Sequence, residues 1–127
     1  MSQAGSRSTR VLAISGGVGG AKLALGLSRL LSPEQLTIVA NTADDFTHLG
    51  LHVCPDIDTL LYTLAGRSNK ELGWGVEGET WAVMDALQLL EGETWFRLGD
   101  RDLATQDRKS TRLNSSHSSV SRMPSSA

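Results

Sequence analysis

The amino-acid sequence predicts an α/β fold with a parallel sheet, and this prediction depends on two apolar runs and the segment between them. Val11–Ile14 and Leu36–Ala40 are short, apolar and partly β-branched, as buried strands are. Between them, Pro33 ends a stretch in which leucine recurs at helical spacing, at Leu23, Leu27 and Leu30, and Ala24 and Leu31 lie beside these leucines on one helix face. Strand, helix and strand in this order form a βαβ unit, whose two strands lie parallel with a right-handed crossover.

Later segments predict further helices and one more strand. Pro55 suits the first turn of a helix that ends at Gly66, with four apolar residues facing inward: Ile57, Leu60, Leu61 and Leu64. A second helix is expected from Thr80 to Leu90, with an inward face of Val83, Leu87 and Leu90. Thr94–Leu98 is expected to be a strand. We interpret the whole as a truncated, Rossmann-like three-layer α/β/α fold.

Composition limits the function classes. The net charge of −2 gives no basis for nucleic-acid or membrane binding, and no stretch is long enough to span a membrane. A single cysteine, Cys54, cannot form an internal disulfide, so we expect a reduced, cytoplasmic setting with Cys54 packed as a small apolar residue.

A glycine-rich turn follows the first strand. Ser15-Gly-Gly-Val-Gly-Gly-Ala-Lys22 matches neither the dinucleotide fingerprint nor the P-loop, and a tight turn without a ligand remains an alternative. Glycines let the backbone approach a phosphate, and the helix N-terminus beyond them offers free N–H groups. The candidate phosphate-binding residues are Gly16, Gly17, Gly19, Gly20 and Lys22.

Carboxylates follow soon after this turn, and they suit Mg²⁺, the usual companion of a bound phosphate. The candidate metal ligands are Asp44, Asp45, Asp56 and Asp58. We expect all four to share one cleft at the carboxyl ends of the strands, with Asp56 and Asp58 off the apolar helix face. A phosphate turn beside a metal site suggests phosphoryl or nucleotidyl transfer. In such a reaction, Asp44 or Asp45 is the candidate catalytic group that orients the attacking hydroxyl, and Lys22 or Arg101 can offset the charge that develops on the phosphate. His48 is expected to be a solvated loop histidine or a polar contact.

The C-terminal composition differs from the rest. Residues 107–127 are rich in serine, and Asp107–His117 reads like a frame translation of a common sequencing adapter. We therefore expect three parts: a disordered N-terminus at 1–8, the N-terminal part of a Rossmann-like domain at 9–106, and a disordered, artefactual tail at 107–127.

Six motifs in a fixed order resemble the N-terminal part of the 2-phospho-L-lactate transferase family of coenzyme F420 biosynthesis. They are Ile14–Lys22, Asn41–Asp45, Cys54–Thr59, Leu61–Gly66, Gly73–Gly75 and Leu98–Thr105. The resemblance covers about Thr9 to Gln106 and corresponds to the first third of the family's proteins.

The resemblance implies transfer of a 2-phospholactyl or phosphoenolpyruvyl group from a guanosine-diphosphate-linked donor to the deazaflavin 7,8-didemethyl-8-hydroxy-5-deazariboflavin (Fo). It also implies Mg²⁺ as cofactor and release of GMP. Deazaflavin contacts of the family map to Asp58 and Arg97, where arginine replaces a common lysine and alters the geometry. Which aspartate holds metal and which meets the deazaflavin stays open, and so does a homodimer.

Two alternatives stand beside this function. One is a related family of non-catalytic, nucleotide-sugar-binding regulators, which shares the glycine turn but lacks the motifs at Cys54–Asp58 and Leu98–Asp102. The other is a fragment without activity, because an incomplete sheet leaves an unpaired edge and uncovered apolar helix faces.

Overall fold

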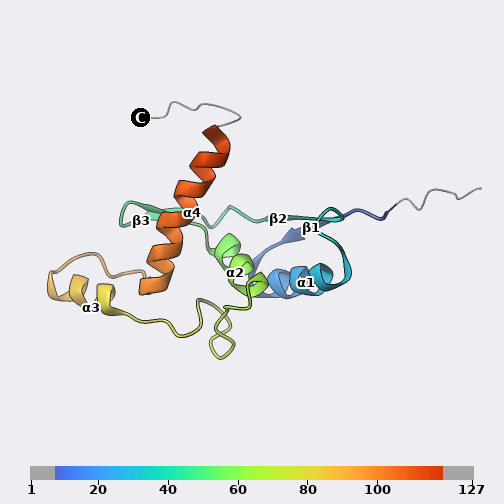
Figure 1. Ribbon diagram of the computed structural model, residues 1–127. Helices are drawn as coiled ribbons and strands as arrows, with labels where there is room; N and C mark the ends of the chain where they lie inside the picture. Colours follow the sequence, from blue (N-terminus) through green and yellow to red (C-terminus); the bar gives the residue numbers. More distant parts are fainter. Residues whose placement is uncertain (1–7, 119–127) are drawn as a thin grey trace, which may run out of the picture. The chain divides into compact units, whose positions relative to one another are not determined.

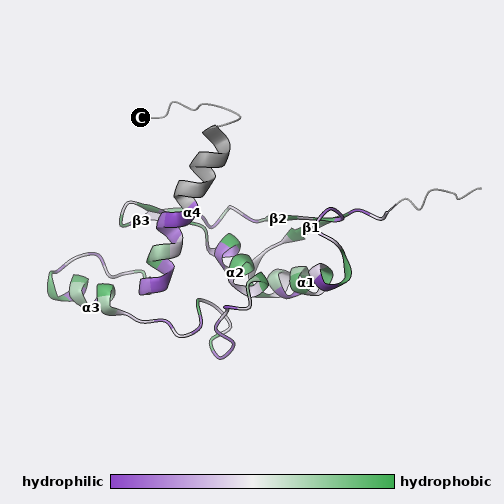
Figure 2. Ribbon diagram, viewed as in Figure 1, coloured by the Kyte–Doolittle hydropathy of each residue, from purple (hydrophilic) through white to green (hydrophobic). Residues whose placement is uncertain are grey.

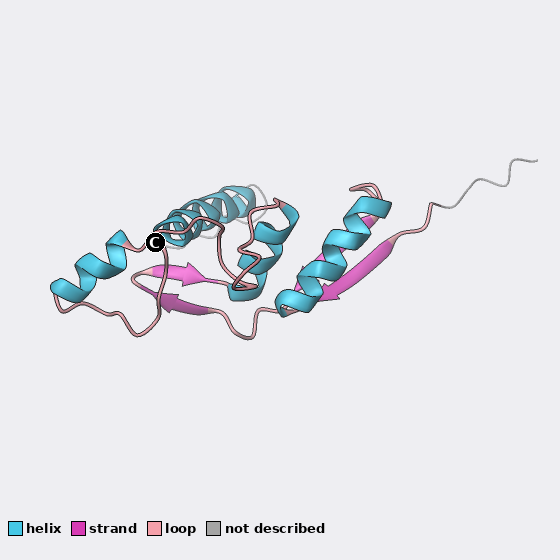
Figure 3. Cartoon of the chain, turned by 90° about the horizontal axis from the view of Figure 1, so that it is seen from below, coloured by secondary structure: helices cyan, strands magenta, loops and turns pink. Residues whose placement is uncertain are grey.

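The computed structural model describes residues 8–118, which form two compact units. The first unit contains residues 8–44 and 54–75, and the second contains residues 45–53 and 76–118. Figure 1 colours the elements by their order in the chain, and Figure 3 distinguishes helices, strands and loops by colour. Each unit contains one two-stranded sheet and two helices.

A βαβ unit opens the first unit, as the sequence predicts. Strand β1 (Val11–Ser15) pairs with β2 (Leu36–Ala40) in parallel, with Val11 opposite Leu36. Helix α1 (Gly17–Leu30) connects the two strands and contacts both of them. The predicted α/β class and the parallel pairing are therefore confirmed.

Helices α1 and α2 (Pro55–Leu64) pack on each other, and both contact the sheet. The core of this unit consists of Ala21, Ala24 and Leu60, with two partly buried strand residues packed against it, Ile38 and Ala40. On β1, alternate residues such as Ala13 are buried, whereas Ile14 is 80% exposed. The hydrophobic colour of β1 in Figure 2 thus includes apolar side chains that face solvent.

The inward faces of both helices differ from the predicted ones. Leu23 and Leu30 are 58% and 83% exposed, whereas Ala24, which belongs to the predicted face, is buried together with Ala21. Small alanine side chains let the helix approach its neighbours closely, a choice that the leucine spacing cannot reveal. On α2, Leu61 and Leu64 are exposed, and the buried positions are Asp58, Leu60 and Tyr62.

Gly20 lies close to the end of β1. A Cβ atom at this position would lie 2.5 Å from Ser15 Oγ and 3.1 Å from Ser15 Cα. The first separation is too short for a contact and the second is unusually tight, so the absence of a side chain at Gly20 favours this placement of the helix.

The second unit begins with an antiparallel hairpin that the sequence analysis does not pair. Strand β3 (Phe46–His48) lies opposite β4 (Leu51–Val53), and the two turn residues, Leu49 and Gly50, both have positive φ, at 53° and 72°. This turn geometry matches the right-handed twist of a hairpin but is costly for leucine. Packing of Leu49 against the core of the unit offsets that cost.

Helices α3 (Ala82–Leu89) and α4 (Asp100–Ser118) complete the second unit, and α4 contacts both β4 and α3. Its core is formed by Val53, Met84 and Leu98. The predicted inward face of α3 is wrong at Val83 and Leu90, which are 41% and 78% exposed, because Met84 occupies the core instead.

The predicted strand Thr94–Leu98 is absent, because the segment has no ladder partner among the described residues. Instead, Trp95 and Phe96 join an aromatic cluster with Phe46 and His48; the His48 and Trp95 ring centroids lie 4.9 Å apart. His48 is 2% exposed, so the expectation of a solvated histidine is wrong.

The expected three-part layout has its two disordered parts at the ends of the chain. Residues 1–7 of the expected disordered N-terminus and residues 119–127 of the predicted tail lie outside the described residues. Within the described part, α4 continues through Asp107 as far as Ser118. No helix in that part has the length and apolarity that crossing a membrane requires.

The Gly20 contact yields a stability prediction. Replacing Gly20→Ala should lower the free energy of unfolding by ~1–3 kcal/mol, because the new methyl group overpacks against Ser15. The matched control is Gly26→Ala on the same helix, where a Cβ meets nothing within 4 Å, and it should raise stability by ~0.5–1 kcal/mol. Urea unfolding measures both, and equal stability of the two variants would contradict the packing account.

Candidate functional site

The glycine turn places the N-terminus of α1 at the end of β1. Gly16 is the N-cap residue in an extended conformation without a side-chain cap, and Gly17 follows with φ of 63°, a left-handed conformation that favours glycine. The first N–H groups of a helix have no partners within the helix, and the helix dipole makes this end positive. The turn therefore suits an anionic oxygen.

A carboxylate oxygen from this chain already lies at that position. The Gly17 N–H donates to Asp56 Oδ1 at 2.7 Å, although the two residues are 39 positions apart in the sequence. Asp56 lies in the first turn of α2, which packs against α1. The structure thus brings one predicted metal ligand directly to the predicted phosphate turn.

Asn41 joins a second carboxylate to the same group. It follows β2, and its Nδ2 donates to Asp56 Oδ2 at 3.0 Å and to Asp44 Oδ2 at 3.4 Å. Two of the four predicted aspartates, Asp44 and Asp56, therefore accept hydrogen bonds from the same Asn41 amide beside the glycine turn.

The other predicted residues of this unit lie elsewhere on the helices. Asp58 is 7% exposed, so the prediction that it stands off the packed face of α2 is wrong. The reason is that α2 is covered on two sides: Leu60 packs in the core with α1, and Asp58 lies on the other side, one turn before the buried Tyr62. Lys22 is exposed on α1, two residues beyond the turn.

The four glycines of the turn differ in what the fold requires of them. Gly17 needs its backbone conformation, and Gly20 needs its close packing. In contrast, a Cβ at Gly16 would make only an ordinary contact of 3.8 Å, and one at Gly19 would meet nothing within 4 Å. The fold itself leaves room for side chains at Gly16 and Gly19. A ligand that approaches the backbone closely would occupy this room and would therefore require glycine at both positions.

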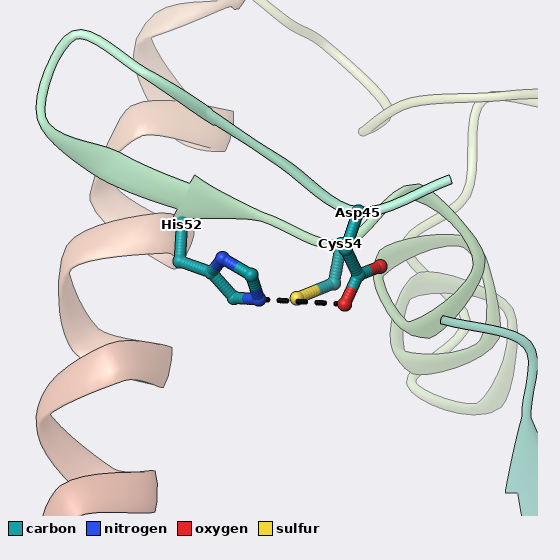
Figure 4. A group of neighbouring side chains, drawn as sticks. All are labelled: Asp45, His52 and Cys54. Carbon is teal, nitrogen blue, oxygen red and sulfur yellow. Dashed lines mark ion pairs between the residues drawn. The ribbon is translucent and has the colours of Figure 1, made fainter. Parts of the chain in front are cut away.

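In the second unit, Asp45 pairs with a histidine of the hairpin. Figure 4 shows His52 Nε2 directed at Asp45 Oδ2, at 3.3 Å. Asp45 Oδ1 is buried and has no hydrogen-bond partner among the described residues. Cys54, which follows this hairpin, is buried and is not part of a disulfide, as the sequence predicts. The predicted cleft shared by all four aspartates stays a prediction with respect to Asp45 and Asp58.

Arg97 lies beside a shallow pocket of the second unit. Its guanidinium carbon is 4.5 Å from the centre of the Trp81 ring, a cation–π arrangement. The pocket has a volume of about 240 Å³ and is lined by Met84, Asp85, Gln88, Thr94 and Arg97. A flat, hydrogen-bonding ligand is compatible with such a lining.

The segment around Asp100 and Arg101 has a structural role. Asp100 accepts from the N–H groups of Ala82 and Val83 at the start of α3 and from the Thr80 hydroxyl, at 2.6 Å. In return, Glu79 accepts from the N–H groups of Arg101 and Asp102 at the start of α4, at 2.8 and 3.1 Å. Each helix N-terminus is thus capped by a carboxylate from outside that helix.

These hydrogen bonds shift the titration of Asp100. The Thr80 hydroxyl and then the Val83 N–H lower the pKa of its carboxyl group, because they stabilise the charged form. The Arg101 guanidinium donates to the Glu77 carbonyl oxygen at 3.5 Å, so in this structure it contacts the loop before α3.

Two features of the site were missed by the sequence analysis. Asn41 lies in the motif Asn41–Asp45, and the sequence did not indicate a role for its side chain. An asparagine after a strand nevertheless often accepts a hydrogen bond from the N–H group two residues further along. Glu79 lies in no motif, and its partners are 22 and 23 residues away, so no local signal could reveal it.

A comparison with protein families decides which family these features belong to. The model described as 2-phospho-L-lactate transferase CofD matches residues 11–125. The chain belongs to this family. The match continues beyond Gln106, where the sequence analysis placed the end of the family-like region.

Similar proteins carry related names. The chain is 42% identical over 111 residues to a phosphoenolpyruvate transferase of Kitasatospora aureofaciens, covering 86% of this chain and 35% of that protein. It is 41% identical over 107 residues to a 2-phospho-L-lactate transferase of Methanothermobacter thermautotrophicus, covering 84% of this chain and 35% of that protein. The chain thus spans about a third of the length of these relatives.

The caps between α3 and α4 yield a pH prediction for this CofD-family chain. Asp100→Ala should lower the urea midpoint at about pH 7, because two N–H groups of α3 lose their acceptor. Because the pKa of Asp100 is lowered in the folded chain, its carboxylate stabilises the fold at pH values above the pKa of the unfolded state. This stabilisation is lost as the pH falls through the pKa of the folded state. The difference from the unchanged chain should therefore shrink as the pH is lowered below the unfolded pKa of an aspartate.

Asp85→Ala is the matched control, because Asp85 is an exposed acid in the first turn of α3. Its effect at neutral pH should be smaller than that of Asp100→Ala. A midpoint difference for Asp100→Ala that stays constant from neutral to acid pH would contradict the role of the ionised carboxylate.

Proposed function

We propose that this chain is the phosphate- and metal-binding part of a transferase that makes the F420 precursor. The donor is a guanosine diphosphate that carries a 2-phospholactyl or phosphoenolpyruvyl group, and the acceptor is the deazaflavin Fo. Membership of the CofD family and the names of the similar proteins support a transferase of this kind.

The hydrogen bond from Gly17 to Asp56 is the observation that carries the proposal. A carboxylate oxygen at 2.7 Å from the Gly17 N–H supports the view that the turn binds an anionic oxygen. A phosphate oxygen of the donor has the same acceptor chemistry, so the other N–H groups of this helix start, beyond the one that Asp56 occupies, suit it. The open space at Gly16 and Gly19 is consistent with such a ligand.

Mg²⁺ fits the residues beside the turn. Asp44 and Asp56 present carboxylate oxygens to the same Asn41 amide, and hard oxygen ligands are what Mg²⁺ prefers. Asp45 and Asp58 are further proposed ligands. When bound, the ion neutralises charge on the transferring phosphoryl group.

The chain's own residues align the reaction. The glycine turn holds the donor phosphates, and the ribityl hydroxyl oxygen of Fo forms a bond to the outer phosphorus. The bond from that phosphorus to the bridging oxygen breaks, and GMP leaves with this oxygen and its electron pair. Asp44 or Asp45 accepts the hydroxyl proton, and Lys22 offsets the charge that develops.

Arg97 and Asp58 are the proposed deazaflavin contacts. The pocket beside Arg97 supports this for a flat ring system, since Arg97 already stacks on Trp81. The burial of Asp58 is compatible with a carboxylate that meets a buried ligand.

Family membership favours the transferase over the related nucleotide-sugar-binding regulator. We further propose a cytoplasmic enzyme that binds neither nucleic acid nor membrane. Because the relatives are about three times longer, we propose that the isolated chain is inactive by itself.

A chimaera tests the activity. Residues 11–106 of this chain would replace the matching segment of the Methanothermobacter relative, and Fo consumption and GMP release would be measured with Mg²⁺ present. In an active chimaera, Asp58→Asn should cut the transfer rate by about 100-fold or more, because a charged contact is lost.

The control is Glu71→Gln, an exposed acid in a loop of the same unit as Asp58, which should leave the rate nearly unchanged. Because Asp58 is buried, circular dichroism must show that both variants keep the fold. A folded Asp58→Asn chimaera with normal turnover would reject Asp58 as a site residue, and a donor without a guanosine diphosphate that works equally well would reject the reaction.

The glycine turn can be tested separately from turnover. Gly19→Ala should be neutral or stabilising by ~0.5–1 kcal/mol, because a Cβ there meets nothing. It should nevertheless weaken binding of the donor to the chimaera by about 10-fold, because the methyl group blocks close approach of the phosphate. Calorimetric titration with the donor measures this. Unchanged affinity in a stable Gly19→Ala variant would contradict phosphate binding at the turn.

A further inference from the structure

Asn41 joins the strand ends, the glycine turn and two carboxylates. Its backbone N–H donates to the Ser15 carbonyl oxygen at 2.9 Å, which extends the pairing of β1 and β2 by one residue. The Cα atom of Asn41 is thereby held at the end of the sheet, directly beside the start of the glycine turn.

The side chain of Asn41 is oriented by its own loop. Asn41 Oδ1 accepts from the Ala43 N–H at 3.1 Å, an interaction that fixes the direction of the amide plane. Nδ2 then faces Asp56 and Asp44, and it donates to one oxygen of each. Both N–H groups of the amide are used, one for each carboxylate.

Asp56 is held at both of its oxygens as a result. Oδ1 accepts from the Gly17 N–H, and Oδ2 accepts from Asn41. Two neighbouring carboxylates repel each other, and a shared donor between them reduces this repulsion while keeping them close. The neutral amide donor thus fixes two oxygen ligands without supplying a positive charge that would compete with a cation.

We propose that Asn41 is a positioning residue of the phosphate and metal site. It orients Asp56 against the glycine turn and keeps Asp44 beside it, so that both carboxylates are preorganised for a divalent cation. This inference rests on the proposed function for the identity of the cation, but the orientation of Asp56 can be tested without any ligand.

Asn41→Ser is the variant that separates the two roles of the side chain. A serine hydroxyl can still accept from the Ala43 N–H and so keep the turn, but it is too short to donate to both carboxylates. Asn69→Ser is the matched control, because Asn69 Oδ1 accepts from the N–H groups of Glu71 and Leu72 in a loop of the same unit.

Amide hydrogen exchange of the isotope-labelled 127-residue chain provides the first measurement. Exchange at Gly17 reports the bond to Asp56, and exchange at Val39, whose N–H faces β1 in the parallel register, reports opening of the whole unit. We expect Asn41→Ser to speed exchange at Gly17 by about 10-fold without changing Val39, whereas Asn69→Ser leaves both unchanged.

Titration with Mg²⁺ alone, followed in the same spectra, provides the second measurement. Supporting groups behind metal ligands typically affect affinity by 10–100-fold, so we expect about 10-fold weaker Mg²⁺ binding in Asn41→Ser. Asn69→Ser should bind Mg²⁺ as the unchanged chain does. A purely structural role of Asn41 would lower stability without moving the Mg²⁺ midpoint.

The outcomes separate this inference from the proposed function. Unchanged exchange at Gly17 in folded Asn41→Ser would overturn the positioning role, as would an unchanged Mg²⁺ midpoint. An unchanged chain that shows no response to Mg²⁺ would contradict the proposed metal site, while the Gly17 exchange still decides whether Asn41 orients Asp56. If Asn41→Ser does not fold, Asn41→Asp replaces it in the exchange measurement, because it keeps the acceptor for Ala43 and repels Asp56.

Discussion

The close approach of α1 to β1 is the constraint on which the arrangement of the first unit depends. Gly20 allows the helix to lie against Ser15, so the helix begins at the carboxyl end of β1. Because β2 is parallel to β1, its carboxyl end lies at the same edge, and Asn41 bonds to Ser15 there. The meeting of the glycine turn with Asn41 and Asp56 follows from this geometry, since α2 packs on α1 and brings the first turn of α2 to the same place.

The sequence was sufficient for the parts of this arrangement that depend on pattern. The β-branched residues of Leu36–Ala40 and the breaking residue Pro33 predicted the βαβ unit, and parallel strands predicted that Asp44 and Asp56 would approach the glycines. Pattern could not tell which stripe of α1 faces inward. Leucine spacing marks a hydrophobic stripe, but the closely packed side belongs to Ala21 and Ala24, whose small size matters only once the neighbours are in place.

The second unit was harder to predict because its interactions are long-range. Leu49 in the hairpin turn has a conformation that a turn sequence would ordinarily assign to glycine or asparagine. The reciprocal caps of Glu79 and Asp100 join segments that are about twenty residues apart, and they give a structural reason for acidic residues in the motif Leu98–Thr105. A motif that is recognised by resemblance can therefore combine structural residues such as Asp100 with a candidate ligand contact at its N-terminal border, Arg97.

The open face of the first sheet has a thermodynamic consequence. Leu12 and Ile14 are 64% and 80% exposed, and Val39 is 49% exposed, so these side chains are already hydrated in the folded chain. Unfolding then adds less new apolar surface to water than the composition suggests, and the heat-capacity increment falls below the usual ~12–15 cal/mol/K per residue. We therefore expect a flat stability curve for this unit and a shallow dependence on urea. An uncovered sheet face is by itself sufficient to broaden a melting transition, without a mixture of native states.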